Sequence, residues 1–143
     1  MSARALLWPM VAMAALTFVV AVVMYRRRIA EIRAKRIRPQ SLASAVAMAT
    51  ELEDTAAADN FRNLFEAPVL FYAASLLAYA IGASSPALVA LLWAYVALWV
   101  VHSVIHCTSN RVIRRFQAFA ASLAVLLAIW VVVAWHLATG AAA

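Results

Sequence analysis

The chain has 143 residues, of which 68% are hydrophobic and 13% are charged, and its formal net charge is +6. This balance excludes an ordinary soluble domain, in which about 25% of residues are charged. It also disfavours nucleic-acid binding, because basic residues that flank apolar spans more often set membrane topology and contact anionic lipid. The length has room for about four membrane helices of ~20 residues, so residues 1–143 are predicted to form a single all-helical integral membrane domain.

The first apolar segment runs from Ala5 to Tyr25, which is long enough to cross a membrane as a helix. A signal peptide would carry its positive charge before a shorter apolar core, whereas the basic cluster of residues 26–38 follows this segment. We therefore expect the segment to be retained. The positive-inside rule then predicts that residues 26–38 lie in the cytoplasm and that Met1 lies on the opposite side.

The second predicted helix follows an Ala-rich, acidic connection, residues 39–59, and runs from Asp59 or Asn60 to about Ile81. Pro68 lies inside this helix and has no backbone N–H to donate to the carbonyl of Leu64. The sequence therefore predicts a bend near Pro68, with a freed carbonyl group that a neighbouring side chain or a ligand must satisfy.

Two further helices complete the predicted bundle. The third runs from Ala87 to about Thr108 after a turn without basic residues, and the fourth runs from about Phe116 to Leu137. Of the twelve Lys and Arg residues, only Arg4 then lies on the non-cytoplasmic side, which supports placing both termini there. The fourth helix also carries a face of small residues that suits close helix contact: Ala120, Ala124 and Ala128.

A polar group marks the start of the second helix. In a continuous helix Arg62 and Glu66 lie four residues apart, and Asn63 and Glu66 lie three apart, so all three side chains are expected on one face. Glu66 opens an uncharged run, and an ionisable group at the hydrocarbon boundary is costly and usually functional. The alternative is that Arg62 pairs with Glu66 only to anchor the end of the helix.

A second polar group follows at the same membrane level, at the end of the third helix and in the loop after it: His102, His106, Arg111, Arg114 and Arg115. Together with the carboxylate of Glu66, these side chains suit a small anionic or zwitterionic ligand. The two histidines also have the i, i+4 spacing of metal ligands, but no third ligand is defined, so no metal site is predicted. A further alternative is that the histidines hydrogen-bond across the bundle as polar packing.

The polar residues at the helix ends form a pattern of three short motifs: Arg62-Asn63-x-x-Glu66, His102-x-x-x-His106 and Arg111-x-x-x-Arg115. This pattern resembles the MAPEG family, the membrane-associated proteins in eicosanoid and glutathione metabolism, and the four spans fit that family along nearly the whole chain. The resemblance implies a four-helix homotrimer that binds glutathione between adjacent subunits, toward the cytoplasmic side.

The resemblance also implies roles for single residues. Arg115 matches the arginine that stabilises the glutathione thiolate and is the predicted catalytic residue. The residues predicted to bind the cofactor glutathione are Arg62, Asn63, Glu66, His102, His106 and Arg111. The implied activity is a glutathione-dependent transferase or peroxidase acting on a lipophilic electrophile that arrives through the bilayer. The alternative is a non-enzymatic membrane subunit that keeps the fold and binds a partner or a lipid headgroup with the same basic face.

Three positions depart from the pattern of the eicosanoid branches of that family. His106 stands where those branches have a tyrosine, and Phe119 stands where the prostaglandin branch has another. Asp59 stands where an arginine precedes the asparagine by four residues. These differences place the chain in a divergent, bacterial-type branch, so we expect the protein in a bacterial inner membrane.

Both termini are predicted to be non-cytoplasmic, because Lys and Arg are confined almost entirely to residues 26–58 and 107–115, which are predicted to lie in the cytoplasm. Reporter fusions measure this directly: a reporter that is active only in the cytoplasm is expected to be silent after Ala143 and active when inserted in residues 39–58. Activity after Ala143 would contradict the topology and the predicted side of the site.

Overall fold

The computed structural model describes residues 3–140, and every regular element within that range is helical. Four helical segments are long and apolar enough to cross a membrane: Arg4–Lys35, Ala56–Ala80, Pro86–Cys107 and Val112–Thr139. The prediction of an all-helical integral membrane protein with four spans is therefore confirmed.

The first span extends well beyond its apolar part. A short 3-10 helix, η1 (Ala3–Leu6), leads into α1 (Leu7–Lys35), which continues ten residues past the predicted end at Tyr25. The extension carries most of the basic cluster: Arg26, Arg33 and Lys35 are exposed, whereas Arg27 and Arg28 are partly buried. Arg36 ends α1 in a left-handed conformation, with φ of 53°.

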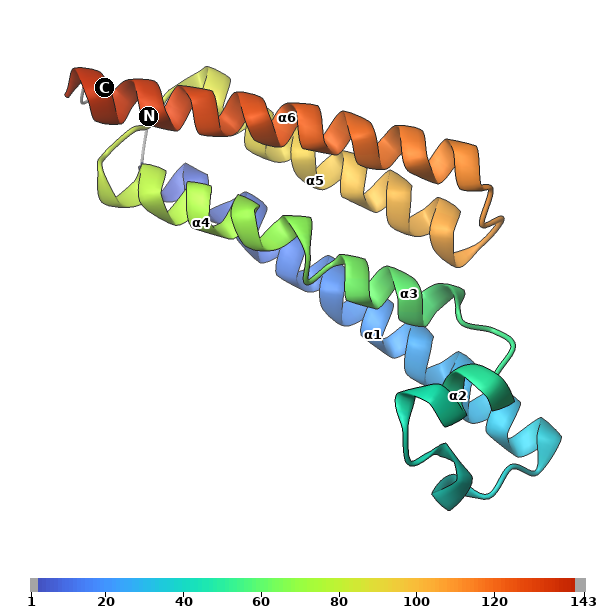
Figure 1. Cartoon of the computed structure of the whole chain (residues 1–143). Helices are drawn as coiled ribbons and strands as arrows, with labels where there is room; N and C mark the ends of the chain where they lie inside the picture. The colour runs from blue at the N-terminus through green and yellow to red at the C-terminus, as the bar shows by residue number, and fades with distance from the viewer. Residues whose placement is uncertain (1–2, 141–143) are drawn as a thin grey trace.

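The connection to the second span contains two short helices, η2 (Pro39–Leu42) and α2 (Ala45–Glu51). The side chain of Ser44 caps α2 by accepting a hydrogen bond from the backbone N–H of Ala47 at 3.1 Å. Figure 1 shows α2 beside the extended end of α1, at the opposite end of the bundle from η1 and the end of α6.

The second span is broken into α3 (Ala56–Asn63) and α4 (Ala67–Ala80). The predicted bend near Pro68 is thus confirmed, and it is a complete interruption. Pro68 lies in the first turn of α4, where its missing N–H is tolerated, and Glu66 before it is non-helical, with φ −97° and ψ −98°. Figure 1 shows α4 displaced from α3 across a short non-helical segment.

The third and fourth spans form an antiparallel hairpin of α5 (Pro86–Cys107) and α6 (Val112–Thr139), which lie side by side in Figure 1. The turn between α4 and α5 contains Gly82 at φ 70°. Ser85 then caps α5 by accepting a hydrogen bond from the backbone N–H of Leu88.

A column of buried aromatic side chains runs along the middle of the bundle toward the α5–α6 turn. Phe71 on α4 stacks on Tyr95 of α5, with ring centroids 4.6 Å apart. Tyr95 is followed by Trp99, whose ring lies edge-on to Phe119 of α6 at 6.1 Å. Trp99 also packs against the imidazole of His102. The apolar core therefore leads directly to the polar residues of the third span.

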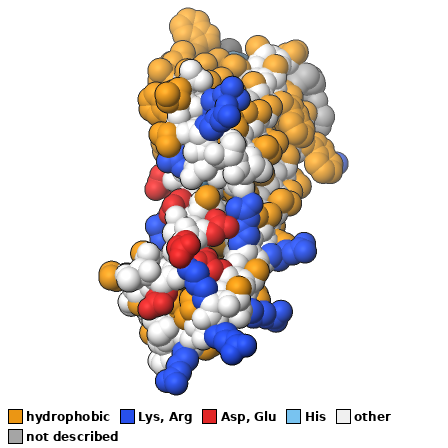
Figure 2. All heavy atoms as spheres, turned by 90° about the vertical axis from the view of Figure 1, so that its right-hand side faces the viewer, with side chains coloured by type: hydrophobic (Ala, Val, Ile, Leu, Met, Phe, Trp, Pro, Cys, Tyr) orange, Lys and Arg blue, Asp and Glu red, His pale blue; other side chains and the backbone are white. Residues whose placement is uncertain are grey.

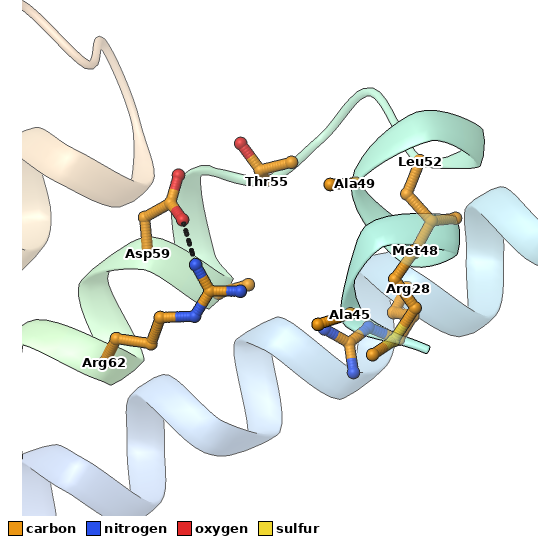
Figure 3. Close-up of a pocket in the computed structure, with 9 residues that line it drawn as sticks. Arg28, Ala45, Met48, Ala49, Leu52, Thr55, Asp59 and Arg62 are labelled. Carbon is orange, nitrogen blue, oxygen red and sulfur yellow. Dashed lines mark hydrogen bonds and ion pairs between the residues drawn. The ribbon is translucent and has the colours of Figure 1, made fainter. Parts of the chain in front are cut away.

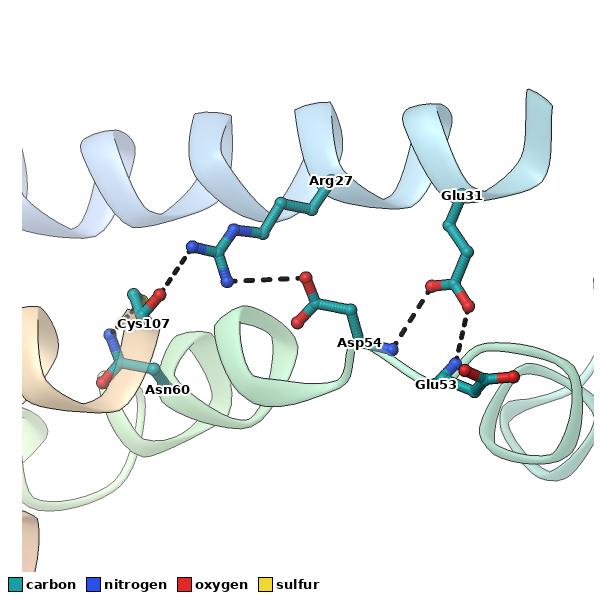
Figure 4. Close-up of polar contacts among 6 residues, drawn as sticks. All are labelled: Arg27, Glu31, Glu53, Asp54, Asn60 and Cys107. Atoms are coloured by element: carbon teal, nitrogen blue, oxygen red, sulfur yellow. Dashed lines mark hydrogen bonds and ion pairs between the residues drawn. The ribbon is translucent and has the colours of Figure 1, made fainter. Parts of the chain in front are cut away.

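The extension of α1 is fixed to the rest of the chain by charged contacts (Figure 4). Arg27 donates to the backbone carbonyl of Cys107 at 2.5 Å and pairs with Asp54 at 3.5 Å. Glu31 accepts hydrogen bonds from the backbone N–H groups of Glu53 and Asp54. Figure 2 shows this end from outside, with acidic side chains gathered between Lys and Arg.

Asn60 connects α3 to α5 and is completely buried. Its amide Nδ2 donates to the thiol sulfur of Cys107 at 3.5 Å, and its Oδ1 accepts from the hydroxyl of Ser103 at 3.4 Å. Both bonds are long, but a buried amide without them would have no partner on α5.

Asn60→Ala is expected to lower the free energy of unfolding by about 1–3 kcal/mol, because it leaves buried groups on α5 without their partner. The measurement is the thermal midpoint of the purified protein in detergent. Gln40→Ala, at an exposed position of η2, is the control. Equal midpoints for the two variants would show that the amide does not hold α3 against α5.

Candidate functional site

A cavity of about 290 Å³ lies between the α3–α4 break and the first turns of α6. Three separate parts of the chain supply the residues that line it: Asn63, Glu66, His102, Val112, Arg115, Phe116 and Phe119. The lining therefore combines a carboxylate, a guanidinium, an imidazole and an amide with an apolar wall from α6. Such a surface suits a ligand that has both charged and apolar parts.

Arg115 lies in the first turn of α6 and is held by two side chains. Its Nη1 donates to Oδ1 of Asn110 at 2.6 Å and lies 2.7 Å from Nε2 of His106. A guanidinium has donors and no acceptor, so Nε2 of His106 must accept. His106 is therefore neutral in this arrangement and carries its hydrogen on Nδ1.

His102 joins α5 to the start of α6. Its Nδ1 lies 3.0 Å from the backbone carbonyl oxygen of Arg115. A carbonyl oxygen only accepts, so Nδ1 donates, and in the neutral ring Nε2 keeps a lone pair. The ring is buried between Trp99 and Phe119, with centroid distances of 5.2 Å and 6.0 Å. This contact fixes the position of Arg115 along the bundle axis relative to α5.

Arg62 does not join this group within one chain, and the expected shared face with Glu66 is wrong. The helix stops at Asn63, so the spacing of a continuous helix no longer applies across the break. Arg62 pairs instead with Asp59 at 3.4 Å, and its side chain is 68% exposed. It lines a different pocket, of about 220 Å³, together with Arg28 on α1 (Figure 3).

The other predicted site residues divide into two groups. Asn63, Glu66, His102 and Arg115 line the cavity. His106 is buried and contacts Arg115 without lining the cavity, while Arg111 is exposed at the N-cap of α6. Among residues 3–140, no three His, Cys, Asp or Glu side chains are grouped as metal ligands.

Asn110 contacts Arg115 but was not among the residues predicted from the sequence. It lies in the α5–α6 turn at φ 45°, and its backbone N–H donates to the carbonyl of Ile105 at 2.8 Å. Asparagine tolerates positive φ better than most residues, so the sequence signal is that of a turn residue. Its contact with a guanidinium five positions later depends on the path of that turn.

Comparison with known proteins gives one match. A sequence model of the MAPEG family matches residues 6–135, which include every residue that lines the cavity. No curated protein and no solved structure matches the chain significantly.

Proposed function

The chain belongs to the MAPEG family, and from this premise we propose that it is a glutathione-dependent membrane transferase or peroxidase acting on lipophilic electrophiles. The observation that carries the proposal is the position of Arg115, which lines the same cavity as Asn63 and Glu66. A fixed positive charge, a carboxylate and an amide are able to contact the sulfur, ammonium and peptide groups of a thiol tripeptide.

Arg115 is the proposed catalytic residue, because a guanidinium is always charged and favours a thiolate beside it over the neutral thiol. Phe119 lies one turn further along α6 and has no hydroxyl group to assist. The nucleophilic form of glutathione therefore depends on Arg115, while the thiol proton passes to water. In the transferase reaction the thiolate sulfur then forms a carbon–sulfur bond to the electrophile, whose leaving group departs with its bonding electron pair.

The electrophile is proposed to enter along α6. Val112 and Phe116 line the cavity and are also exposed on the outside of the chain, Phe116 to 64%. An apolar substrate dissolved in the bilayer meets these side chains first, while Glu66 and Asn63 hold the polar tripeptide on the opposite wall. This division of the lining supports a reaction between a polar thiol and a lipophilic partner.

We propose a homotrimer in a bacterial inner membrane, with the cavity on the cytoplasmic side. Supporting this, one face of α6 packs inside the chain through residues such as Ser122 and Ile129, whereas Ala120 and Ala124 on the other face are exposed. Small exposed residues at this spacing suit close contact with a second copy. In such an assembly Arg62 and Arg111 are available to a neighbouring cavity.

Arg115→Ala is expected to abolish the thiolate of bound glutathione, while tripeptide binding persists through Asn63 and Glu66. Arg115→Lys keeps the charge but loses the planar fork, so it is expected to retain on the order of a tenth of the wild-type rate, about the value of one hydrogen bond to a charged group. The measurement is the ultraviolet absorbance of bound thiolate against pH, together with turnover.

Arg114→Ala is the matched control for that experiment, because Arg114 is an exposed neighbour of the same charge that does not line the cavity. Wild-type protein that binds glutathione without a thiolate near neutral pH would support the non-enzymatic alternative. An unchanged thiolate signal in Arg115→Ala would remove this residue from the mechanism.

Glu66→Gln is expected to leave a folded oligomer and to weaken glutathione binding about tenfold, since it removes the charge from a hydrogen bond to the ligand's ammonium group. Calorimetry measures the affinity, and size-exclusion chromatography in detergent measures assembly. Glu51→Gln, an exposed carboxylate at the end of α2, is the control. Failed assembly with unchanged affinity in the surviving fraction would make Glu66 a structural anchor.

A further inference from the structure

The guanidinium of Arg115 is held on one side only. Both of its hydrogen bonds to side chains start from Nη1, one to Oδ1 of Asn110 at 2.6 Å and one to Nε2 of His106 at 2.7 Å. A terminal guanidinium nitrogen carries two hydrogens, so these two acceptors use both donors of Nη1. The donors on Nη2 and Nε form the opposite edge of the planar group and bind neither acceptor.

We propose that His106 and Asn110 are positioning residues that lock Nη1 of Arg115 and thereby direct its Nη2–Nε edge at the sulfur of the bound thiol. The inference deepens the proposed function and rests on it. Neither residue lines the cavity, so neither is placed to touch the ligand, and their effect passes through Arg115.

Both acceptors are neutral, and this matters for the charge in the cavity. A carboxylate in either position would hold Nη1 equally well but would compensate the positive charge that a thiolate requires. An amide oxygen and a neutral imidazole instead orient Arg115 and leave its charge available. Among the residues that line the cavity, the only carboxylate is Glu66, which comes from the α3–α4 break.

The two acceptors are themselves fixed. Asn110 is anchored through its backbone N–H to the carbonyl of Ile105 at the end of α5. His106 is buried one helical turn from His102, and the rings lie edge-on with centroids 5.4 Å apart. A guanidinium held by one residue on α5 and one in the α5–α6 turn loses rotamer freedom before the ligand binds, which lowers the entropic cost of orienting it during the reaction.

The arrangement fixes the hydrogen of each imidazole for a different reason, which supplies an internal control. His106 carries its hydrogen on Nδ1 because the side chain of Arg115 donates to Nε2. His102 carries its hydrogen on Nδ1 because the backbone carbonyl of residue 115 accepts it. Substitution at position 115 removes the first cause and keeps the second.

Nitrogen-15 NMR of histidine-labelled protein in micelles, without ligand and at mildly alkaline pH, directly tests the hydrogen bond from Arg115 to His106. Wild-type protein is expected to show protonated Nδ1 and unprotonated Nε2 for both His102 and His106. In Arg115→Ala only His106 is expected to lose this preference. A protonated Nε2 on His106 in wild-type protein, or no change in Arg115→Ala, would overturn the proposal whether or not the protein uses glutathione.

Matched substitutions test the consequence for the reaction. In His106→Gln the amide oxygen reaches the place of Nε2 and can accept, whereas the shorter His106→Asn cannot. We expect His106→Asn to lower kcat and the thiolate signal about tenfold, the scale of one hydrogen bond to a charged group, with KM for glutathione nearly unchanged. His106→Gln is expected to retain most of the wild-type rate.

Asn110→Gly keeps a residue that accepts positive φ and removes the acceptor, so it is expected to behave like His106→Asn. Ser109→Ala, at an exposed neighbouring position, is the control. Equal losses in His106→Gln and His106→Asn, or no loss in either, would overturn the positioning role. Absence of thiolate and turnover in wild-type protein would instead reject the proposed function. The NMR result would still show whether Arg115 donates to His106.

Discussion

The missing backbone N–H of Pro68 is the constraint on which the arrangement around the cavity depends. Inside a membrane, backbone groups that lose their helical partner must find another, so an interruption is tolerated only where the chain can close it. Here a tight turn supplies two such partners: Phe65 donates to the carbonyl of Arg62 at 2.9 Å and Glu66 to that of Asn63 at 3.2 Å. Neither bond is accepted by the carbonyl of Leu64, the group that Pro68 would have paired in a continuous helix. The turn directs Asn63 and Glu66 at the cavity and leaves Arg62 on the side of α1 and α2.

Polar contacts, more than apolar packing, fix how the helices meet at this end. Lipid tails are as apolar as leucine, so apolar side chains alone discriminate poorly between another helix and the bilayer. Arg27 joins α1 to the carbonyl end of α5, Asn60 joins α3 to α5, and His102 joins α5 to the backbone of α6 at Arg115. These contacts fix the positions of the spans along the bundle axis relative to one another. The cavity residues on α3, α5 and α6 lie close together because of those positions.

The contacts of Arg115 explain how its positive charge remains available to a ligand in an apolar environment. Arg115 is only partly buried, and its neighbours His106 and Asn110 are neutral acceptors, so no buried ion pair cancels its charge. Glu66 lines the same cavity and is exposed, which lowers the cost of keeping its carboxylate charged. In the proposed reaction Arg115 contacts the thiolate of glutathione and Glu66 contacts its ammonium group.

The sequence by itself determined the four spans, a bend near Pro68 and the convergence of His102 and Arg115, because the length of each apolar run, a missing donor and the alternation of span direction can be read along the chain. That the bend is a complete interruption was decided by the tertiary structure. The departure of Arg62 from the cavity and the helical continuation of α1 were decided by tertiary structure. From a proline one can predict that the helix bends, but not which of the neighbouring side chains will line the cavity beyond the bend. The partners of Asn60 and Asn110 depend on distances between segments far apart in the chain or across a turn, which side-chain periodicity along one helix does not encode.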